Sequence, residues 1–245
     1  MKKILMLLVL SCMLLLGDPL QRLHVRYDIS YAIFGVIGVS EAMLTIDPKQ
    51  KRYHIVNTAR AKGVAKLMSA HRIERYESKG RVVDGLLVPE RFTTITEKGK
   101  YYKEVHRYRF NHAKHRVWHL KRITTREGTT ERESLLGFYA KDDLQTLFFN
   151  LPRYVRRGIC KADRCTLYAV GANKKDGRVD IYPAKHEMLR VILHRRIFAS
   201  KEGEIFVHLT KEGISDFAML KDVIFFGDIK AKATKIEKNY TTKGK

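Results

Sequence analysis

The sequence predicts a mainly β protein, built from an antiparallel meander that curls toward a sandwich or a barrel. From Val25 to Ile33 every second residue is apolar or aromatic, which is the pattern of a strand with one face in the core and the other in water. Turn residues recur at short intervals, for example at Asp47-Pro48-Lys49 and Glu97-Lys98-Gly99. Because the runs between such turns are short and lack intervening helices, a parallel α/β fold is disfavoured.

The first element is a signal peptide over residues 1–17. Lys2 and Lys3 precede an apolar run from Ile4 to Leu16, and polarity returns directly afterwards, which is the layout of a cleavable export signal. The run is shorter than the roughly 20 residues that a membrane-spanning helix needs. Lipid attachment at Cys12 is an alternative, although the apolar residues that follow it are unlike a polar tether. We expect an exported protein, periplasmic or associated with the outer membrane.

The chain is strongly basic. It has 48 Lys and Arg against 26 Asp and Glu, a net charge of +22, and about +20 remains after loss of Lys2 and Lys3. For an exported protein the matching anions are lipid headgroups, lipopolysaccharide phosphates or an acidic membrane surface, rather than nucleic acid. A charge spread evenly over the surface would recognise nothing, and this alternative stays open.

The strand pattern continues through most of the chain. It is found in Val25–Ile33, Tyr53–Ala61, Arg72–Glu77, Tyr101–Phe110, Thr166–Val170, Arg178–Tyr182, Leu189–His194 and Glu204–Leu209. Within the fourth run, Glu104, His106 and Tyr108 share one face of the strand. Since no repeat or linker interrupts the pattern, residues 18–238 are expected to form a single β-rich domain, followed by a basic flexible tail at residues 239–245.

Two stretches have helical rather than alternating patterns. Gly63 to Ala70 is long enough for one or two helical turns. The better helix runs from Asp142 to Leu151, because its apolar residues recur at helical spacing, Asp142 or Asp143 can cap its first turn, and Pro152 lies just past its end. This helix is expected to cover an open end or the concave face of the sheet.

Cys160 and Cys165 enclose four residues in a chain with an export signal. An oxidising compartment favours a local disulfide between them, and loss of Cys12 with the signal peptide leaves an even number of cysteines. The spacing is not that of a Cys-x-x-Cys redox site.

No catalytic or cofactor motif is present. The chain lacks Gly-x-Ser-x-Gly, His-Glu-x-x-His and Gly-rich phosphate loops, and the adjacent pair Asp142 and Asp143 fits a helix cap better than an acid and base. His112, His115 and His119 would share a face on a helix, but the alternation places the first two at a hairpin turn, so surface histidines are favoured over a metal site. We therefore expect no enzyme, no metal and no cofactor.

An apolar helix followed by arginines is the best candidate for a binding site. The proposed ligand contacts are Leu147, Phe148, Leu151, Arg153, Arg156 and Arg157. The apolar residues suit the tail of an amphiphile and the arginines an acidic headgroup. In the competing interpretation the apolar residues are ordinary core and the arginines form a solvated turn.

Several short motifs resemble a known bacterial envelope family. These are Tyr27–Tyr31, Gly35 and Gly38, Leu87–Phe92, and Asp143–Leu147 leading to Gly158. They resemble the family called domain of unknown function three-one-zero-eight, over most of the mature chain. The resemblance implies a strongly curved antiparallel sheet, a half-barrel similar to the lipoprotein carriers LolA and LolB, with one covering helix near residues 142–151. It implies no catalytic residues.

Together these observations predict a non-catalytic envelope protein. It would bind an apolar or amphipathic molecule, such as a lipid, an acyl chain or a glycolipid, inside the curved sheet. The alternative is a basic scaffold or adaptor with a filled interior that contacts anionic envelope polymers or partner proteins. An open apolar cavity favours the first function and a filled core with a contiguous basic face favours the second. No pattern indicates the oligomeric state.

Overall fold

The computed structural model describes residues 20–31, 34–157, 164–195, 197, 203–210, 214–223 and 227–240. The predicted signal peptide, Cys12 and Cys160 lie outside these ranges. The export signal and the Cys160–Cys165 disulfide therefore stay predictions.

Fifteen strands in the described ranges form one sheet that is not closed, in the order β8-β7-β6-β5-β4-β3-β2-β1-β15-β14-β13-β12-β11-β10-β9. The strands are β1 (Leu20–Tyr31), β2 (Val36–Asp47), β3 (Arg52–Ala61), β4 (Ile73–Val83), β5 (Leu86–Lys98), β6 (Tyr102–Asn111), β7 (Arg116–Thr125), β8 (Gly128–Leu135), β9 (Asp142–Asp143), β10 (Cys165–Val170), β11 (Arg178–Pro183), β12 (Met188–Ile192), β13 (Glu204–Leu209), β14 (Ser215–Val223) and β15 (Gly227–Tyr240). The predicted mainly β, antiparallel, half-barrel class is confirmed.

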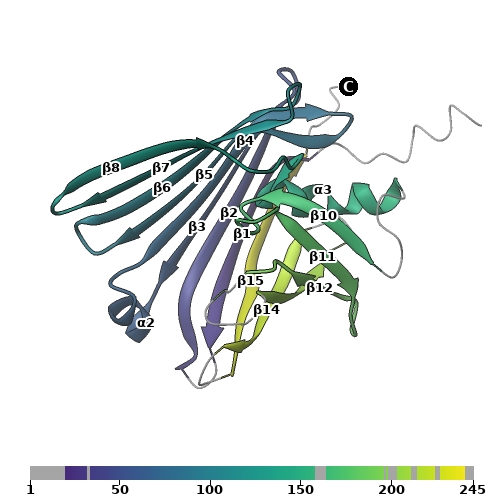
Figure 1. Cartoon of the computed structure of the whole chain (residues 1–245). Helices are drawn as coiled ribbons and strands as arrows, with labels where there is room; N and C mark the ends of the chain where they lie inside the picture. Colours follow the sequence, from purple (N-terminus) through teal and green to yellow (C-terminus); the bar gives the residue numbers. More distant parts are fainter. Residues whose placement is uncertain are drawn as a thin grey trace, which may run out of the picture.

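The sheet consists of two meanders joined at their first and last strands. Neighbouring strands are antiparallel except β9 and β10, which are parallel. β1 pairs on one side with β2 and on the other with β15, where Val25 lies opposite Ile236. Figure 1 shows the consequence: β4 to β8 form one wing and β10 to β12 the other, on either side of the long central strands. The two wings face the same interior.

The Lys-rich end of the chain is a strand that the sequence pattern did not reveal. In β15 the intermediate positions Ile229, Ala231 and Ala233 alternate with exposed Lys230 and Lys232. Small alanines give a weak apolar signal, so the alternation is hidden by the lysines. The strand includes Asn239 and Tyr240, which the sequence analysis placed in the flexible tail, and residues 241–245 lie outside the described ranges.

Helix α3 (Leu144–Arg156) is the predicted covering helix. Asp143 caps it, as expected, because its Oδ1 accepts hydrogen bonds from the backbone N–H groups of Gln145 (2.8 Å) and Thr146 (2.9 Å). The predicted end at Leu151 is wrong, since Pro152 lies inside the helix. A proline costs the helix one hydrogen bond, but the next turn is held in place by Tyr154, which is buried and donates its hydroxyl to Asp142 (2.5 Å).

Side-chain amides and carboxylates fasten α3 to the sheet. The Asn150 side-chain amide pairs with the backbone of β5 as a neighbouring strand would: its Nδ2 donates to Leu87 O and its Oδ1 accepts from Leu87 N, both at 2.9 Å. Asp143 accepts a hydrogen bond from Ser78 of β4 at 2.5 Å. Because all of these groups are buried, loss of one partner would leave another polar group unsatisfied. The position of α3 across the sheet is therefore strongly defined.

Three hydrophobic clusters build the interior. The first joins α3 to β10–β13 and includes Leu147 and Leu151. The second lies along β1–β3 and includes Leu23 and Val25, with Phe149 of α3 packed against it. The third surrounds Phe92 in the wing formed by β4 to β8. Since α3 contributes to the first two clusters, the space between them falls directly beneath the helix.

Helix α2 (Gly63–Met68) connects β3 to β4 and matches the short helix expected near Gly63–Ala70. None of its residues is buried. Figure 1 shows it at the end of the sheet, away from α3.

Candidate binding site

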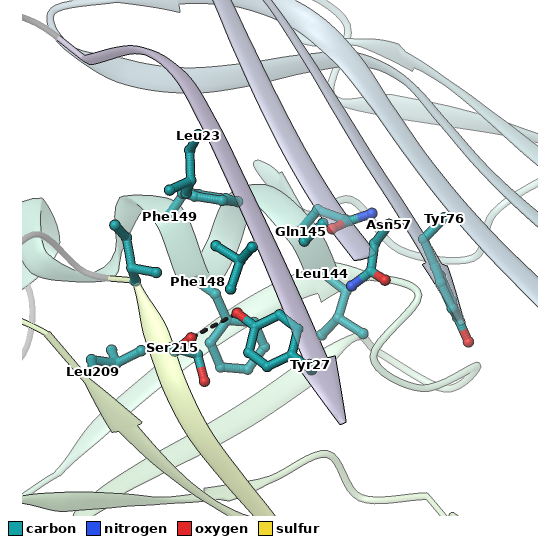
Figure 2. A pocket seen from close by; sticks show the side chains of 13 residues that line it. Leu23, Tyr27, Asn57, Tyr76, Leu144, Gln145, Phe148, Phe149, Leu209 and Ser215 are labelled. Atoms are coloured by element: carbon teal, nitrogen blue, oxygen red, sulfur yellow. Dashed lines mark hydrogen bonds between the residues drawn. The ribbon is translucent and has the colours of Figure 1, made fainter. Parts of the chain in front are cut away.

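An apolar cavity of about 280 Å³ lies between α3 and the inner face of the central strands. Its lining residues are Leu23, Val25, Tyr27, Ala42, Asn57, Tyr76, Leu144, Gln145, Phe148, Phe149, Leu209, Ile214 and Ser215. Figure 2 shows that the helix supplies one wall and β1 another, with Phe148 and Tyr27 near the middle. The wall is mainly hydrocarbon and aromatic, so the cavity suits an apolar group.

Two polar side chains in the cavity wall differ in their hydrogen bonding. Tyr27 donates its hydroxyl to the carbonyl oxygen of Ser215 at 2.6 Å, and burial raises the pKa of Tyr27 to about 12, so it stays neutral. Gln145 differs, because its Nε2 is buried and has no hydrogen-bond partner among the described residues. A buried donor without an acceptor costs about 1–3 kcal/mol. A carbonyl or carboxylate oxygen in the cavity would remove that penalty.

A larger, basic cleft of about 830 Å³ borders the apolar cavity. It is lined by Arg72, Glu74, Tyr76, Phe92, Thr94, Thr96, His106, Tyr108, Leu144, Gly171, Asn173, Lys174, Lys175, His194, Arg195 and Ile197. Tyr76 and Leu144 line both spaces. The cleft separates the inner face of β4–β6 from the loops that follow β10 and β12, so it lies between the two wings of the sheet.

Cations dominate the cleft. Arg72 is ion-paired with Glu74, yet its Nε is buried without a partner in the described structure. Lys174 and Lys175 stand on a tight loop in which Asn173 Oδ1 accepts three backbone N–H bonds of 3.0–3.1 Å. Arg195 donates to Gly171 O at 2.9 Å. With Glu74 as the acidic lining residue, the cleft carries an excess of positive charge and suits an anion.

The floor of the cleft is an aromatic and histidine surface on the wing of β4 to β8. Glu104, His106 and Tyr108 share this inner face, as the alternation predicted, and the His119 ring stacks on Tyr108 at 4.5 Å. His106 and His119 share a hydrogen bond of 2.9 Å. Burial, with a smaller contribution from His106, lowers the pKa of His119 to about 4. The floor is therefore uncharged at its histidines near neutral pH.

The comparisons with known proteins bear on this geometry. Residues 26–158 match the family described as "Protein of unknown function (DUF3108)". The chain belongs to this family. The match begins within β1 and extends through α3, and therefore includes Tyr27, Gln145 and Phe148 but not Lys174 or Arg195. No curated protein matches the chain.

A solved structure shares the fold of this DUF3108 protein. It is a β-barrel-like protein of domain of unknown function DUF1849 from Brucella abortus, with 9% sequence identity and a TM-score of 0.51, and the alignment covers 91% of this chain and 100% of that chain. At this identity the likeness concerns the fold alone. It shows that the half-barrel extends beyond the residues matched to the family.

The structure separates the six residues predicted to contact a ligand. Phe148 lines the apolar cavity and also packs against the first hydrophobic cluster, whereas Leu147 and Leu151 are buried inside that cluster. Arg153 lies against Gly85 and Arg157 donates to Asp84 O at 2.7 Å, both at the β4–β5 turn. The side chain of Arg156 lies outside the described part. Ligand contact by these residues stays a prediction, but they do not form one group.

The three histidines singled out in the sequence also separate. His112 hydrogen-bonds Tyr139 and Pro89 O, and His115 stacks on Tyr139 at 4.8 Å. His119 instead faces the basic cleft beside His106. In the part of the chain that the structure describes, no group of three or more His, Cys, Asp or Glu residues could hold a metal ion.

The cleft residues could not be found by local motifs. Arg72, Lys174 and Arg195 are far apart in sequence and meet because the first and last strands pair. The sequence does contain one signal for the cavity: Leu23, Val25 and Tyr27 are every second residue of β1, and all three line the cavity. No helix in the described ranges is long and apolar enough to cross a membrane.

Proposed function

We propose that this protein is an exported, non-catalytic envelope protein that binds an amphiphile: a lipid, an acyl chain or a glycolipid. The observation that carries the proposal is the contact between an apolar cavity and a basic cleft, which share Tyr76 and Leu144. An amphiphile likewise joins an apolar hydrocarbon chain to a polar or charged headgroup. Its hydrocarbon chain would enter beneath α3 and its headgroup would stay between the wings.

Burial of hydrocarbon supplies most of the affinity in this proposal. Each methylene group removed from water contributes about 0.8 kcal/mol, or roughly a fourfold change in affinity. The cavity of about 280 Å³ is slightly smaller than the roughly 300–1,000 Å³ that small-molecule sites span. It therefore suits the end of one chain rather than several whole chains.

Polar groups in the cavity and in the cleft supply headgroup preference. Gln145 Nε2 and Arg72 Nε are both buried donors without a partner among the described residues. Gln145 lines the apolar cavity and Arg72 lines the basic cleft. A carboxylate or ester oxygen beside Leu144 would accept a hydrogen bond from Gln145, an anionic group farther along the cleft would accept one from Arg72, and Lys174 and Lys175 would add long-range attraction.

Two titratable groups on the floor beside the cleft, Glu104 and His119, have pKa values that do not suit general acid or base catalysis. Hydrogen bonds from Lys121, Tyr102 and His106 outweigh the burial of the Glu104 carboxyl and lower its pKa to about 2. The pKa of His119 is about 4. A general acid or base works best with a pKa near the operating pH, and neither group meets this condition near neutrality.

Displacement of a fluorescent long-chain fatty acid tests the apolar part of the site. Ala42→Leu places three extra carbon atoms in the cavity, so the affinity should fall roughly tenfold if the chain occupies that space. Thr45→Leu on the outward face of the same strand is the matched control and should bind like the unaltered protein. Equal affinities for the two variants would contradict the proposal.

The headgroup part is tested with the double variant Lys174→Glu/Lys175→Glu. Affinity for the fatty acid should fall about fivefold, while affinity for the corresponding uncharged fatty alcohol should stay unchanged. An equal loss for acid and alcohol would show that the cleft does not hold the headgroup.

The scaffold alternative rests on the outer face of the same wing. Lys79, Arg91, Lys103, Arg107 and Arg122 gather there around a shallow depression, with Glu77 among them. This surface would bind acidic polymers without any apolar cavity. A protein that retains acidic polysaccharide but no amphiphile would have this second function.

A further inference from the structure

The most exposed large apolar side chains of the described structure lie on helix α2. Val64, Leu67 and Met68 are 61%, 72% and 85% exposed. Positions i, i+3 and i+4 lie on one face of a helix, so the three side chains point away from the sheet together. An apolar helix face normally packs on the core. Here it faces outward.

The backbone around α2 is well defined. Lys62 N donates to Ile37 O of β2 at 2.7 Å, and His71 N closes the helix on Lys66 O at 2.7 Å. Gly99 N, in the β5–β6 hairpin, donates to Ala70 O at 2.5 Å. Because both neighbours hold the helix, the exposed face is presented in a fixed position rather than on a loose loop.

Further exposed apolar side chains surround the helix. Phe34 lies in the β1–β2 turn, Val36 begins β2 next to the Ile37 carbonyl to which Lys62 bonds, and Tyr101 lies in the β5–β6 hairpin. Each is about half exposed. We call this set the apolar rim: it consists of Phe34, Val36, Val64, Leu67, Met68 and Tyr101.

The apolar rim is surrounded by cations. From Arg60 to Arg72 the chain has four Lys or Arg residues and no Asp or Glu. In the adjoining hairpins Lys100 and Arg126 lie over the ring of Tyr101, at 5.6 and 4.3 Å from its centre. Apolar side chains combined with Lys and Arg are the two features by which proteins attach to anionic lipid surfaces.

The apolar rim lies next to the basic cleft. Arg72 connects the two, because it lies four residues after the end of α2, its backbone carbonyl oxygen accepts a hydrogen bond from Ala61 N at 3.3 Å, and it lines the cleft. A surface that contacts the rim would therefore also face the entrance between the wings.

We propose that the apolar rim docks on an anionic bilayer, with Leu67 and Met68 inserted below the headgroups and the surrounding cations among them. The docked orientation places the basic cleft against the lipid surface, so an amphiphile passes between membrane and cleft without crossing water. The docking itself rests on the rim alone. Its role in transfer rests on the proposed amphiphile binding.

Vesicle flotation with the mature chain tests the docking. The protein should float with vesicles of phosphatidylethanolamine and phosphatidylglycerol and much less with phosphatidylcholine vesicles. Leu67→Glu/Met68→Glu should lower the bound fraction at least tenfold, because it removes the apolar contact and adds repulsion. Val83→Glu/Leu135→Glu is the matched control, because it makes the same charge change at two other exposed apolar positions. Val83 and Leu135 end β4 and β8, at the ends of these strands that lie away from the apolar rim. It should retain most of the binding.

Equal losses in the two double variants would overturn the proposal, because net charge alone would then explain attachment. The fatty acid displacement assay separates this result from failure of the proposed function. Leu67→Glu/Met68→Glu should bind the fatty acid normally, while Ala42→Leu should float normally.

Tryptophan fluorescence tests directly whether the apolar rim inserts into the bilayer. Trp118 is the one tryptophan of the chain, so Met68→Trp in a Trp118→Phe background reports on the rim alone. Its emission should shift to shorter wavelength with anionic vesicles and be quenched by brominated lipid. An unchanged spectrum in the presence of bound vesicles would contradict insertion.

Discussion

The two helices of this half-barrel use apolar side chains in opposite ways. α3 buries Leu147 and Leu151 against the sheet, whereas α2 exposes Leu67 and Met68. Both segments have apolar residues at helical spacing. The difference comes from their surroundings: α3 crosses the interior between two wings, while α2 sits at a strand end with no opposing layer. An apolar helical pattern therefore predicts an interaction, and the position of the helix determines whether the partner is the core or something outside the chain.

Leu147→Ala should produce the largest effect on stability. The side chain is fully buried, so its removal leaves a cavity and costs about 2–5 kcal/mol. Leu67→Ala is the matching change in α2 and should alter the free energy of unfolding by less than about 0.5 kcal/mol. Urea denaturation of both variants makes the comparison. Similar losses would show that α2 is part of the cooperative core.

Phe148→Ala should lie between these extremes and affect binding more than folding. Phe148 lines an existing cavity, so the stability loss should stay below the 3–5 kcal/mol typical of a core phenylalanine. Fatty acid affinity should fall, because the ring forms part of the cavity wall. If unfolding shows the full core penalty and binding is unchanged, Phe148 belongs to the core alone.

The caps of the two helices predict a difference in pH dependence. α2 has no side-chain cap, while burial, outweighing hydrogen bonds from Ser78 and Thr146, raises the pKa of the α3 cap Asp143 to about 7 from an ordinary value of 3.8. The folded state then holds a proton that the unfolded state has lost. The contribution of protonated Asp143 to the free energy of unfolding is therefore fully present below pH 3.8, and it is lost as the pH rises toward 7.

Comparison of the unaltered protein with Asp143→Asn isolates this contribution. Between pH 5 and 7 the stability of the unaltered protein relative to the variant should fall by on the order of 1 kcal/mol per pH unit. His106 and His119, whose pKa values are lowered, are present in both proteins and cancel in the difference. A difference that is constant with pH would show that the Asp143 carboxyl is ionised throughout.

The fold was largely predictable because strands with one wet face carry their own pattern. β1, β3 and β6 have 10 to 12 residues and alternate clearly, and the Asp143 cap is a local signal. β15 was missed because Ala231 and Ala233 are weakly apolar between lysines. The end of α3 was missed because burial of Tyr154, a tertiary contact, outweighs the local effect of Pro152.

The site was predictable only in part. Leu147 and Phe148 are adjacent apolar residues of α3, and the sequence does not show which of them lines a cavity. Both side chains pack on the first hydrophobic cluster, and only the tertiary packing leaves Phe148 at the wall of the cavity. The cations of the cleft meet through pairings between the two halves of the chain, and the Arg153 and Arg157 cluster instead lies at the β4–β5 turn.

The most direct test of the central claim is native mass spectrometry of the mature protein purified gently from envelope extracts. We expect one bound lipid or acyl chain per protein molecule, which is released on collisional activation and is less abundant in Ala42→Leu. A bare protein that stays bare after repeated exposure to lipid would contradict amphiphile binding and favour the basic scaffold.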